Sequence, residues 1–309
     1  MVHRSQVQQL TSLATFAWRS YATQTMGRPV TKIPIPGVDH IIAVASGKGG
    51  VGKSTTAVNI AVALAGRKKD TGQPLKVGLL DADVYGPSIP QLMNLHGRPE
   101  TGTDRKMNPP EKWGVKCMSM GLLMEEDAPA VWRGPMVMSA LDSFMTKVSW
   151  APLDVLVIDM PPGTGDAQIS IGQRLTLSGA VIVSTPQDVA LIDARRGANM
   201  FRKINVPLLG IVENMSHYEC PACGHKEHIF GEEGALRTAE AMKMDVLGQV
   251  PLQLAIRETS DAGTPIVAHQ PDSASAQAYQ RISTLIYDKL QQLPTQLQPP
   301  LLGRPSGVT

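Results

Sequence analysis

The segment from Gly47 to Ser54, which reads Gly-Lys-Gly-Gly-Val-Gly-Lys-Ser, constrains this chain more than any other. It matches the phosphate-binding loop pattern G-x-x-x-x-G-K-[ST], which is informative only between a strand and a helix. Residues 41–45 form an apolar run typical of a buried strand, and residues 56–65 are rich in Ala, Val and Leu without Gly or Pro. Strand, loop and helix in this order direct backbone N–H groups at a phosphate. The sequence therefore predicts a nucleotide site.

Each part of the loop has an expected role in that site. The glycines let the backbone wrap closely around the anion. Lys53 is expected to reach the β- and γ-phosphates of ATP, and the Ser54 hydroxyl is expected to ligate Mg²⁺. The expected nucleotide-binding residues of the loop are Gly47, Lys48, Gly49, Gly50, Val51, Gly52, Lys53, Ser54 and Thr55.

Further apolar runs alternate with helical segments along the chain. Strands are expected at residues 76–81, 115–121, 153–159, 180–185, 208–212 and 246–250, helices at 136–147, 188–202 and 273–290, and a surface loop at 96–112. Apolar strands that alternate with helices predict an α/β fold, a doubly wound and mainly parallel sheet with helices on both faces. The candidate polar residues follow the carboxyl ends of strands, where such sheets bind ligands.

The N-terminal segment differs in charge from the rest of the chain. Residues 1–38 contain four basic residues and no acidic one. The rest of the chain therefore contains 25 of the 29 basic residues and all 27 acidic residues. A slightly acidic body gives no support for nucleic-acid binding. The acid-free segment is also rich in Ser and Thr, with apolar residues at helical spacing, which indicates a mitochondrial presequence and a matrix location. A disordered N-terminal tail is the alternative.

These features divide the chain into three parts. Residues 1–37 are expected to be the presequence and a linker, and residues 38–291 a P-loop ATPase domain that carries the C-x-x-C motif. Residues 292–309 are rich in Pro, Gln and Leu, which predicts a disordered tail. No apolar run approaches the roughly 20 residues that a membrane-spanning helix needs, so no integral membrane segment is expected.

Three aspartates are candidates for phosphoanhydride hydrolysis, which depends on positioning and charge neutralisation. Asp159 ends an apolar strand and suits a carboxylate in the water shell of the metal, although a strand-end Asp is also a common cap. Asp83 is predicted to orient or deprotonate the attacking water, with Asp81 as the alternative. Residues 161–166, Pro-Pro-Gly-Thr-Gly-Asp, are predicted to be a mobile loop that senses the γ-phosphate, with a rigid turn as the alternative.

Cys220 and Cys223 form a C-x-x-C motif, which occurs in redox disulfides, zinc sites and iron–sulfur sites. A redox pair normally begins a helix, whereas Gly224 follows this pair and no helix-forming run starts before about residue 234. A zinc site completed by His225 and His228 would place its ligands closer together than usual finger spacings. The favoured interpretation is half of a four-thiolate site that a symmetry-related copy completes. The spacing leaves open whether the metal is zinc or iron–sulfur.

Lys48, an additional lysine inside the loop, resembles the signature lysine of the deviant-Walker P-loop ATPases, which include nitrogenase iron protein and the MinD/ParA proteins. In that group the lysine reaches the nucleotide of the partner subunit, so the resemblance implies a homodimer and a catalytic role for Lys48. The motifs at residues 83–88, 159–166, 213–216 and 220–223 resemble the Mrp/NUBPL branch of these ATPases, over roughly residues 38–290.

This resemblance implies an ATP-dependent iron–sulfur cluster carrier, with ATP and Mg²⁺ as cofactors and a slow ATPase activity that gates transfer. It implies a labile [4Fe–4S] cluster between two Cys220/Cys223 pairs, delivered to apoproteins such as subunits of respiratory complex I. Asp83 and Asp159 would be the switch I and Walker B aspartates, and Asn214 would recognise the base. The alternative is a zinc-bridged dimeric ATPase switch of the MinD/ParA kind without cluster transfer.

Overall fold

The computed structural model describes residues 32, 34–124 and 134–295 of the chain. The chain divides into a unit Met1–Lys32 and a compact unit Ile33–Thr309. The presequence predicted within residues 1–37 and the tail predicted at residues 292–309 lie mostly outside the described residues. Of the segment expected to link presequence and domain, Ile35 is buried and belongs to the core of the compact unit.

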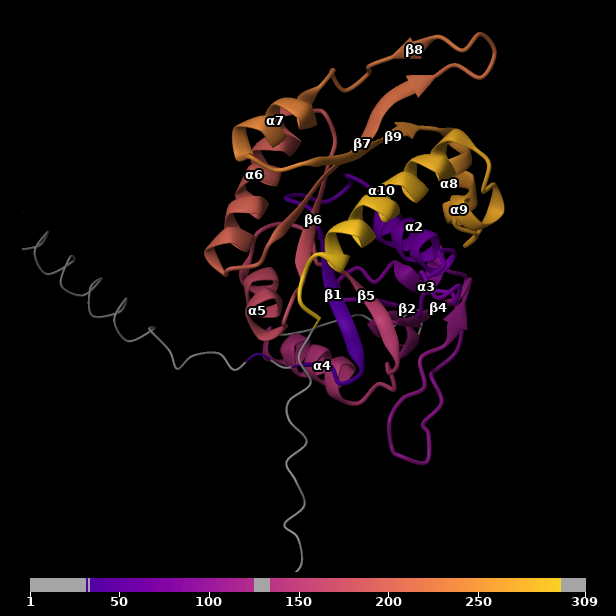
Figure 1. Ribbon diagram of the computed structural model, residues 1–309, viewed down its shortest axis with the longest axis vertical. Helices are drawn as coiled ribbons and strands as arrows, with labels where there is room; N and C mark the ends of the chain where they lie inside the picture. The colour runs from indigo at the N-terminus through magenta and orange to yellow at the C-terminus, as the bar shows by residue number, and fades with distance from the viewer. Residues whose placement is uncertain (1–31, 33, 125–133, 296–309) are drawn as a thin grey trace, which may run out of the picture. The chain divides into compact units, whose positions relative to one another are not determined.

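A nine-stranded sheet organises the described part of the compact unit (Figure 1). The strand order is β3-β4-β2-β5-β1-β6-β7-β8, and β9 also pairs with β7. The strands are β1 (Val38–Ala45), β2 (Val77–Asp81), β3 (Glu111–Lys112), β4 (Val115–Met118), β5 (Leu153–Asp159), β6 (Gly179–Ser184), β7 (Leu208–Glu219), β8 (Lys226–Glu227) and β9 (Val246–Leu252). The pairs β3–β4 and β7–β8 are antiparallel, whereas the other pairs are parallel. The predicted α/β, doubly wound and mainly parallel fold is confirmed.

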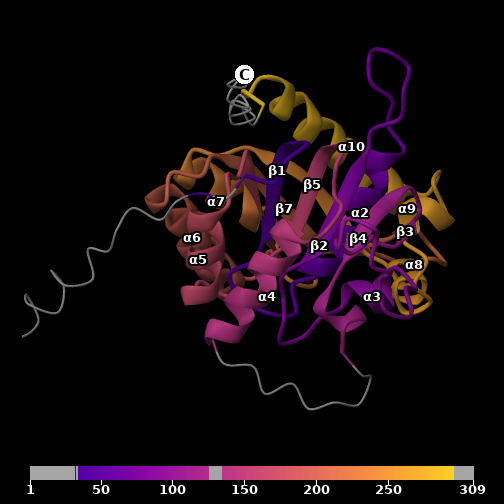
Figure 2. The same cartoon turned by 90° about the horizontal axis from the view of Figure 1, so that it is seen from below.

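Helices cover both faces of this sheet, as Figure 2 shows. One face packs against α2 (Lys53–Ala65), α3 (Ile89–Leu92), α8 (Leu254–Asp261), α9 (Ile266–His269) and α10 (Ala274–Gln291). The other face packs against α4 (Gly134–Thr146), α5 (Asp166–Arg174), α6 (Asp188–Lys203) and α7 (Gly234–Met242). Strand β1 serves both cores, because alternate side chains of a strand point to opposite faces. Ile42 and Val44 enter the first core, and Ile41 and Ala43 enter the second.

The structure corrects several element boundaries. The strand expected at residues 208–212 continues to Glu219, because its polar second half, in which Asn214 and Ser216 are buried, pairs with β8 and β9. The strand expected at 115–121 ends at Met118 and is followed by a 3₁₀ turn, η1 (Met120–Leu122). The loop expected at 96–112 ends in β3, and α5, α8 and α9 are additional elements. In the described part of the chain no helix is long and apolar enough to cross a membrane.

Candidate functional site

The phosphate-binding loop lies between the carboxyl end of β1 and the start of α2. Helix α2 begins after Gly52, which has φ 80° and supplies no side-chain cap, and the first turn carries no acidic residue. The first backbone N–H groups of the helix are therefore free to bind an anion. A cavity of about 290 Å³ opens at this point. It is lined by Ser46, Lys48, Gly49, Gly50, Gly52, Lys53, Ser54, Thr55, Asp83, Ser88, Leu92 and Pro162.

Two glycines of the loop are required by packing, and one of them, Gly52, is required by its conformation as well. A Cβ atom on Gly47 would lie 2.2 Å from the carbonyl carbon of Asp193 in α6. A Cβ atom on Gly52 would lie 2.1 Å from Nδ2 of Asn214, and its φ of 80° is in the left-handed region. By contrast, a Cβ on Gly49 would meet nothing within 4 Å. The two ends of the loop are therefore pressed against α6 and β7, whereas Gly49 faces the cavity.

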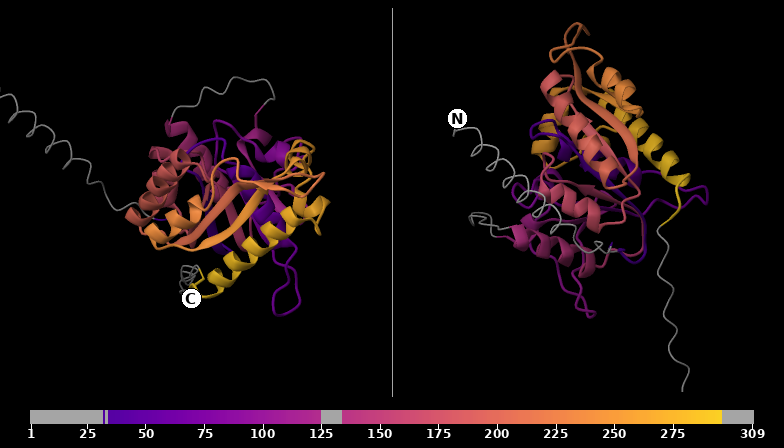
Figure 3. Two further views of the ribbon diagram at one scale, coloured as in Figure 1. Left: turned by 90° about the horizontal axis from the view of Figure 1, so that it is seen from above. Right: turned by 90° about the vertical axis from the view of Figure 1, so that its left-hand side faces the viewer.

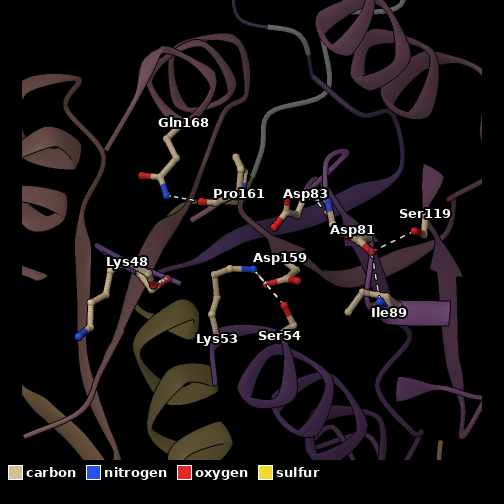
Figure 4. Close-up of polar contacts among 12 residues, drawn as sticks. Lys48, Lys53, Ser54, Asp81, Asp83, Ile89, Ser119, Asp159, Pro161 and Gln168 are labelled. Carbon is tan, nitrogen blue, oxygen red and sulfur yellow. Dashed lines mark hydrogen bonds and ion pairs between the residues drawn. The ribbon is translucent and has the colours of Figure 1, made fainter. Parts of the chain in front are cut away.

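Lys53 forms a buried ion pair at the base of the cavity (Figure 4). Its Nζ lies 2.5 Å from Oδ1 of Asp159, at the end of β5, and 3.0 Å from Oγ of Ser54. The Lys53 and Asp159 side chains are 7% and 0% exposed. Burial raises the pKa of the Asp159 carboxyl above its usual value, and the Lys53 ammonium opposes that shift. Asp159 therefore lies beside the phosphate-binding loop, although Lys53 and Asp159 are 106 positions apart in the sequence.

The residues present suit Mg²⁺ at this point. Oδ2 of Asp159 is buried and has no hydrogen-bond partner in the described part of the chain. The Ser54 hydroxyl lies at the start of α2 and lines the same cavity. A hydroxyl ligand together with a carboxylate that can accept from a water ligand is the oxygen-rich environment that Mg²⁺ prefers. The donor set therefore fits the metal predicted for Ser54.

Burial distinguishes Asp81, the last residue of β2, from Asp83, two positions further on. Asp81 is 1% exposed, and its carboxylate accepts hydrogen bonds from the N–H groups of Asp83 and Ile89 and from the hydroxyl of Ser119. Burial and the charge of Asp159 raise the pKa of Asp81 to about 7. Asp83 instead lines the cavity. Asp81 thus holds the segment between β2 and α3 in place. Asp83 is the one of the two aspartates that can reach a ligand in the cavity.

Lys48 and Asn214 lie on the outer and inner sides of the loop. The Lys48 side chain is partly exposed and points away from the ion pair of Lys53 and Asp159, as Figure 4 shows. Asn214 is 6% exposed, and its Nδ2 donates to the carbonyl oxygen of Val51 at 2.9 Å. The structure therefore gives Asn214 a contact with the loop itself, and its role toward a base stays a prediction.

Gln168 is a site residue that the sequence did not single out. It lies in α5 with 1% exposure, and its Nε2 donates to the carbonyl oxygen of Pro161. The N–H of Gly163 donates to the carbonyl oxygen of Ser46 at 3.1 Å, so the loop after β5 is attached to both α5 and the phosphate-binding loop. No local pattern identifies Gln168, because the contact depends on where α5 begins.

The C-x-x-C motif lies in the turn between β7 and β8, which we call the cysteine hairpin (residues 218–227). The N–H of Gly224 donates to the carbonyl oxygen of Cys220 at 2.8 Å, and Gly224 has φ 71°. Hydrogen bonds from the N–H groups of Ala222 and Cys223, and from the Cys223 thiol, lower the pKa of the Cys220 thiol. The turn therefore favours a thiolate, which is the form that binds metal.

The hairpin extends beyond the helices, as the right-hand view of Figure 3 shows, and residues 221–229 are all exposed. The two nearby histidines are engaged elsewhere. His225 Nε2 lies 3.1 Å from Oε2 of Glu227, and His228 Nδ1 lies 3.2 Å from the carbonyl oxygen of Ser216. Within the residues described, no three His, Cys, Asp or Glu side chains are grouped to hold a metal ion. The four-ligand site within one chain that His225 and His228 would complete is therefore not assembled.

Comparison with known proteins gives a consistent result. A family model described as the NUBPL iron-transfer P-loop NTPase matches residues 37–287. The mouse iron–sulfur cluster transfer protein NUBPL is 55% identical over 287 residues, which cover 93% of this chain and 89% of the mouse protein. The Arabidopsis thaliana iron–sulfur protein required for NADH dehydrogenase, mitochondrial, is 57% identical over 273 residues, 88% of this chain and 86% of that protein. The solved nucleotide-binding protein from Archaeoglobus fulgidus in complex with ADP has a TM-score of 0.66 at 36% identity, covering 77% of this chain and 91% of that one.

Proposed function

The chain belongs to the NUBPL family of iron-transfer P-loop NTPases, and from this premise we propose that it is an ATP-dependent carrier of iron–sulfur clusters. One observation carries the proposal. The same chain presents a phosphate-binding loop with a buried Lys53–Asp159 pair and an exposed hairpin with two thiols, Cys220 and Cys223. Nucleotide binding and cluster binding are therefore assigned to two separate sites, the phosphate-binding loop and the cysteine hairpin.

The cargo of this carrier is a [4Fe–4S] cluster held between two copies of the chain. Such a cluster takes four Cys ligands, and the hairpin supplies Cys220 and Cys223 from one copy. A second copy related by two-fold symmetry supplies the same pair, because a C₂ interface brings identical residues together. The exposure of residues 221–229 leaves such a cluster accessible to a recipient protein, which suits delivery better than permanent storage.

The nucleotide site acts as the switch. Lys53 exchanges its contact with Asp159 for the β- and γ-phosphates of ATP. Ser54 as a ligand, and Asp159 through the water shell, would hold Mg²⁺, which would supply neutralisation of phosphate charge. Asp83 orients or deprotonates the attacking water from its place in the cavity wall. Lys48 reaches the nucleotide of the second copy, which links ATP binding to dimerisation. Hydrolysis is slow, since it gates transfer of a cluster.

Asn214 recognises the adenine base through the oxygen of its side-chain amide, because its Nδ2 already donates to Val51. The recipients are apoproteins that need an iron–sulfur cluster. Subunits of respiratory complex I are the first candidates, since the Arabidopsis relative is described as required for NADH dehydrogenase. This assignment fits the acid-free N-terminal segment, residues 1–37, as a presequence for the mitochondrial matrix.

Anaerobic reconstitution of the purified protein with iron and sulfide tests the proposal. Iron, sulfide and zinc per dimer are then measured together with a Mössbauer spectrum. About four irons and four sulfides per dimer support the carrier, and transfer to an apo iron–sulfur protein, with and without ATP, follows as the functional assay. Stoichiometric zinc that iron does not displace would contradict it and favour a zinc-bridged ATPase switch.

A further inference from the structure

Glu213 is a buried carboxylate that neither the nucleotide site nor the cysteine pair uses. It lies near the middle of β7 and is 1% exposed. Its Oε2 accepts a hydrogen bond from the N–H of Ala235 at 2.8 Å, and its Oε1 accepts one from Nε2 of Gln249 at 2.9 Å. Gln249 lies directly opposite Glu213 in the register of β7 and β9. The carboxylate therefore joins a strand, its neighbour and a helix.

The helix end that Glu213 holds has no cap of its own. Helix α7 begins at Gly234, and the residue before it, Glu233, makes no side-chain capping hydrogen bond. Gly234 is pressed against the preceding chain, since a Cβ there would lie 2.4 Å from the carbonyl oxygen of Pro186. The first N–H groups of a helix need acceptors from outside it, and an acidic group at this end is favoured by the helix dipole. Glu213 supplies that acceptor from the sheet.

The chain between Ser216 and Gly234 projects out of the core and then returns to it. The register of β7 and β9 shifts between Asn214 and Tyr218, and Met215 has φ 55° in the left-handed region. The cysteine hairpin follows, and the chain re-enters the core at α7. Glu213 lies in β7 shortly before this excursion, and its partner Ala235 lies in the first turn of α7, directly after it. The hydrogen bond between them closes the root of the hairpin.

The neighbouring residue makes the link to the other site. Successive side chains of a strand point to opposite faces. Glu213 accordingly contacts α7 on one face, and Asn214 contacts Val51 of the phosphate-binding loop on the other. Six positions further along the same chain stands Cys220. Two adjacent side chains therefore connect the nucleotide loop and the root of the cysteine hairpin to one segment of β7, which Figure 1 shows running from the sheet into the hairpin.

We propose that Glu213 is a positioning residue for the cysteine hairpin, and that the pair Glu213–Asn214 couples the root of this hairpin to the nucleotide loop. The effect of Glu213 on cluster transfer, which this proposal predicts, rests on the proposed function. The effect of Glu213 on the conformation of the hairpin does not rest on it, because Glu213 makes its hydrogen bonds within the chain itself. The two consequences are therefore measured separately.

Glu213→Gln is the test variant, because it keeps the shape of the side chain and replaces one acceptor by a donor. The new amide N–H then faces either the N–H of Ala235, whose hydrogen bond is lost, or the amide of Gln249, which must turn to present its oxygen. In both cases the negative charge that Glu213 places at the start of α7, and the charge-assisted hydrogen bond to Ala235, are lost. In the apoprotein we expect amide hydrogen exchange in residues 216–235 to become about tenfold faster, whereas exchange in α2 stays unchanged. ADP affinity is expected to change by less than about twofold, since the contact between Asn214 and Val51 remains.

A second substitution offers a rescue that a general loss of stability would not permit. In Glu213→Gln combined with Gln249→Glu, the carbonyl oxygen of residue 213 accepts from Ala235 and its amide donates to the new carboxylate. Gln249 is exposed, so a charge is tolerated at that position. We expect the double variant to restore slow exchange in the hairpin. Gln249→Glu alone places two carboxylates opposite each other and is expected to accelerate exchange there.

The matched control is Ser275→Ala, which also removes a buried polar contact, to the side chain of Gln253, at the start of α10. Three results would overturn the proposal. The first is a wild-type rate of amide exchange in residues 216–235 of Glu213→Gln, and the second is an equal acceleration of exchange there in Ser275→Ala. The third is a double variant that does not restore slow exchange in these residues. In the reconstituted protein, Glu213→Gln is expected to release its cluster faster and with a weaker response to ATP. A wild-type protein that takes up no cluster, with the exchange pattern as expected, would leave the positioning role standing and contradict the proposed function.

Discussion

The nucleotide loop and the cysteine hairpin are built in opposite ways. The loop is anchored in the core, with Gly47 pressed against α6 and Lys53 and Asp159 only 7% and 0% exposed. The hairpin projects from the end of β7, and all of residues 221–229 are exposed. The loop region brings the candidate phosphate and Mg²⁺ donors Lys53, Ser54 and Asp159 together within one chain, whereas the hairpin offers two thiols.

This difference teaches where each site obtains its stability. The loop is held by backbone packing and a buried ion pair that exist before any ligand binds. The hairpin is held by short-range hydrogen bonds and by its root at Glu213 and Ala235. A site of exposed thiolates gains its remaining stability from the metal and from whatever supplies the other ligands. Variants should therefore affect one region without the other.

The largest expected effect is on metal binding. Cys223→Ala leaves one thiol per chain, and we expect cluster iron to fall essentially to zero after anaerobic reconstitution, as measured by iron and sulfide analysis. ADP affinity, measured by calorimetry, should change by less than about twofold, because the hairpin makes no part of the nucleotide cavity. Cys117→Ala is the control, since Cys117 is fully buried in β4 and should leave iron loading unchanged. Loss of ADP binding in Cys223→Ala would show that the two regions are not separate.

The converse effect is expected from Lys53→Ala. This change removes the cation that we propose contacts the phosphates, and ADP affinity should fall about 100-fold, which corresponds to about 2.7 kcal/mol. Iron loading of the hairpin should stay close to that of the wild type. Lys48→Ala serves as the matched control, because the Lys48 side chain points away from the ion pair. A single chain should keep its ADP affinity in that variant within about threefold. Equal losses in both lysine variants would contradict the geometry.

A smaller effect is expected from the packing of the loop. Gly47→Ala places a methyl group against the backbone of Asp193, and the free energy of unfolding should fall by about 2 kcal/mol in urea denaturation. Gly49→Ala is the internal comparison, because its methyl group meets no atom within 4 Å. Its free energy of unfolding should stay within about 0.5 kcal/mol of the wild-type value. If the two variants lose equal stability, the anchoring of the loop on α6 is not what holds it.

The smallest effect concerns pH and belongs to the nucleotide region alone. Burial and Asp159 raise the pKa of Asp81 to about 7, so the folded protein keeps a proton that the unfolded chain releases near pH 4. Stability should therefore decrease as pH rises from about 4 to 7, by less than about 1.4 kcal/mol per pH unit. Asp81→Asn should flatten this profile, measured as the melting temperature against pH, while hydrogen exchange in the hairpin keeps its wild-type protection. An unchanged profile in Asp81→Asn would contradict the assignment.

Local patterns predicted much of this molecule because they act over a few residues. The glycine-rich loop between an apolar strand and a helix, the alternation of apolar strands with helices, and the C-x-x-C motif followed by Gly224 all describe short stretches of backbone. These stretches set the local conformation, and the observed fold and the position of the loop agree with them. The polar end of β7 was missed because its buried positions hold polar residues, so that this stretch carries no apolar run.

Contacts between distant segments were decided only by the tertiary structure. The order of the strands brings Asp159 to Lys53 across 106 positions and Asn214 to Val51 across 163. The same order buries Asp81 and leaves Asp83 at the cavity. The sequence alone does not distinguish these two aspartates, because they are only two positions apart. The sequence by itself determined which residues are candidates for the chemistry, since residue type and spacing are local properties. The fold decided which of them meet, because strand pairing depends on the whole chain at once.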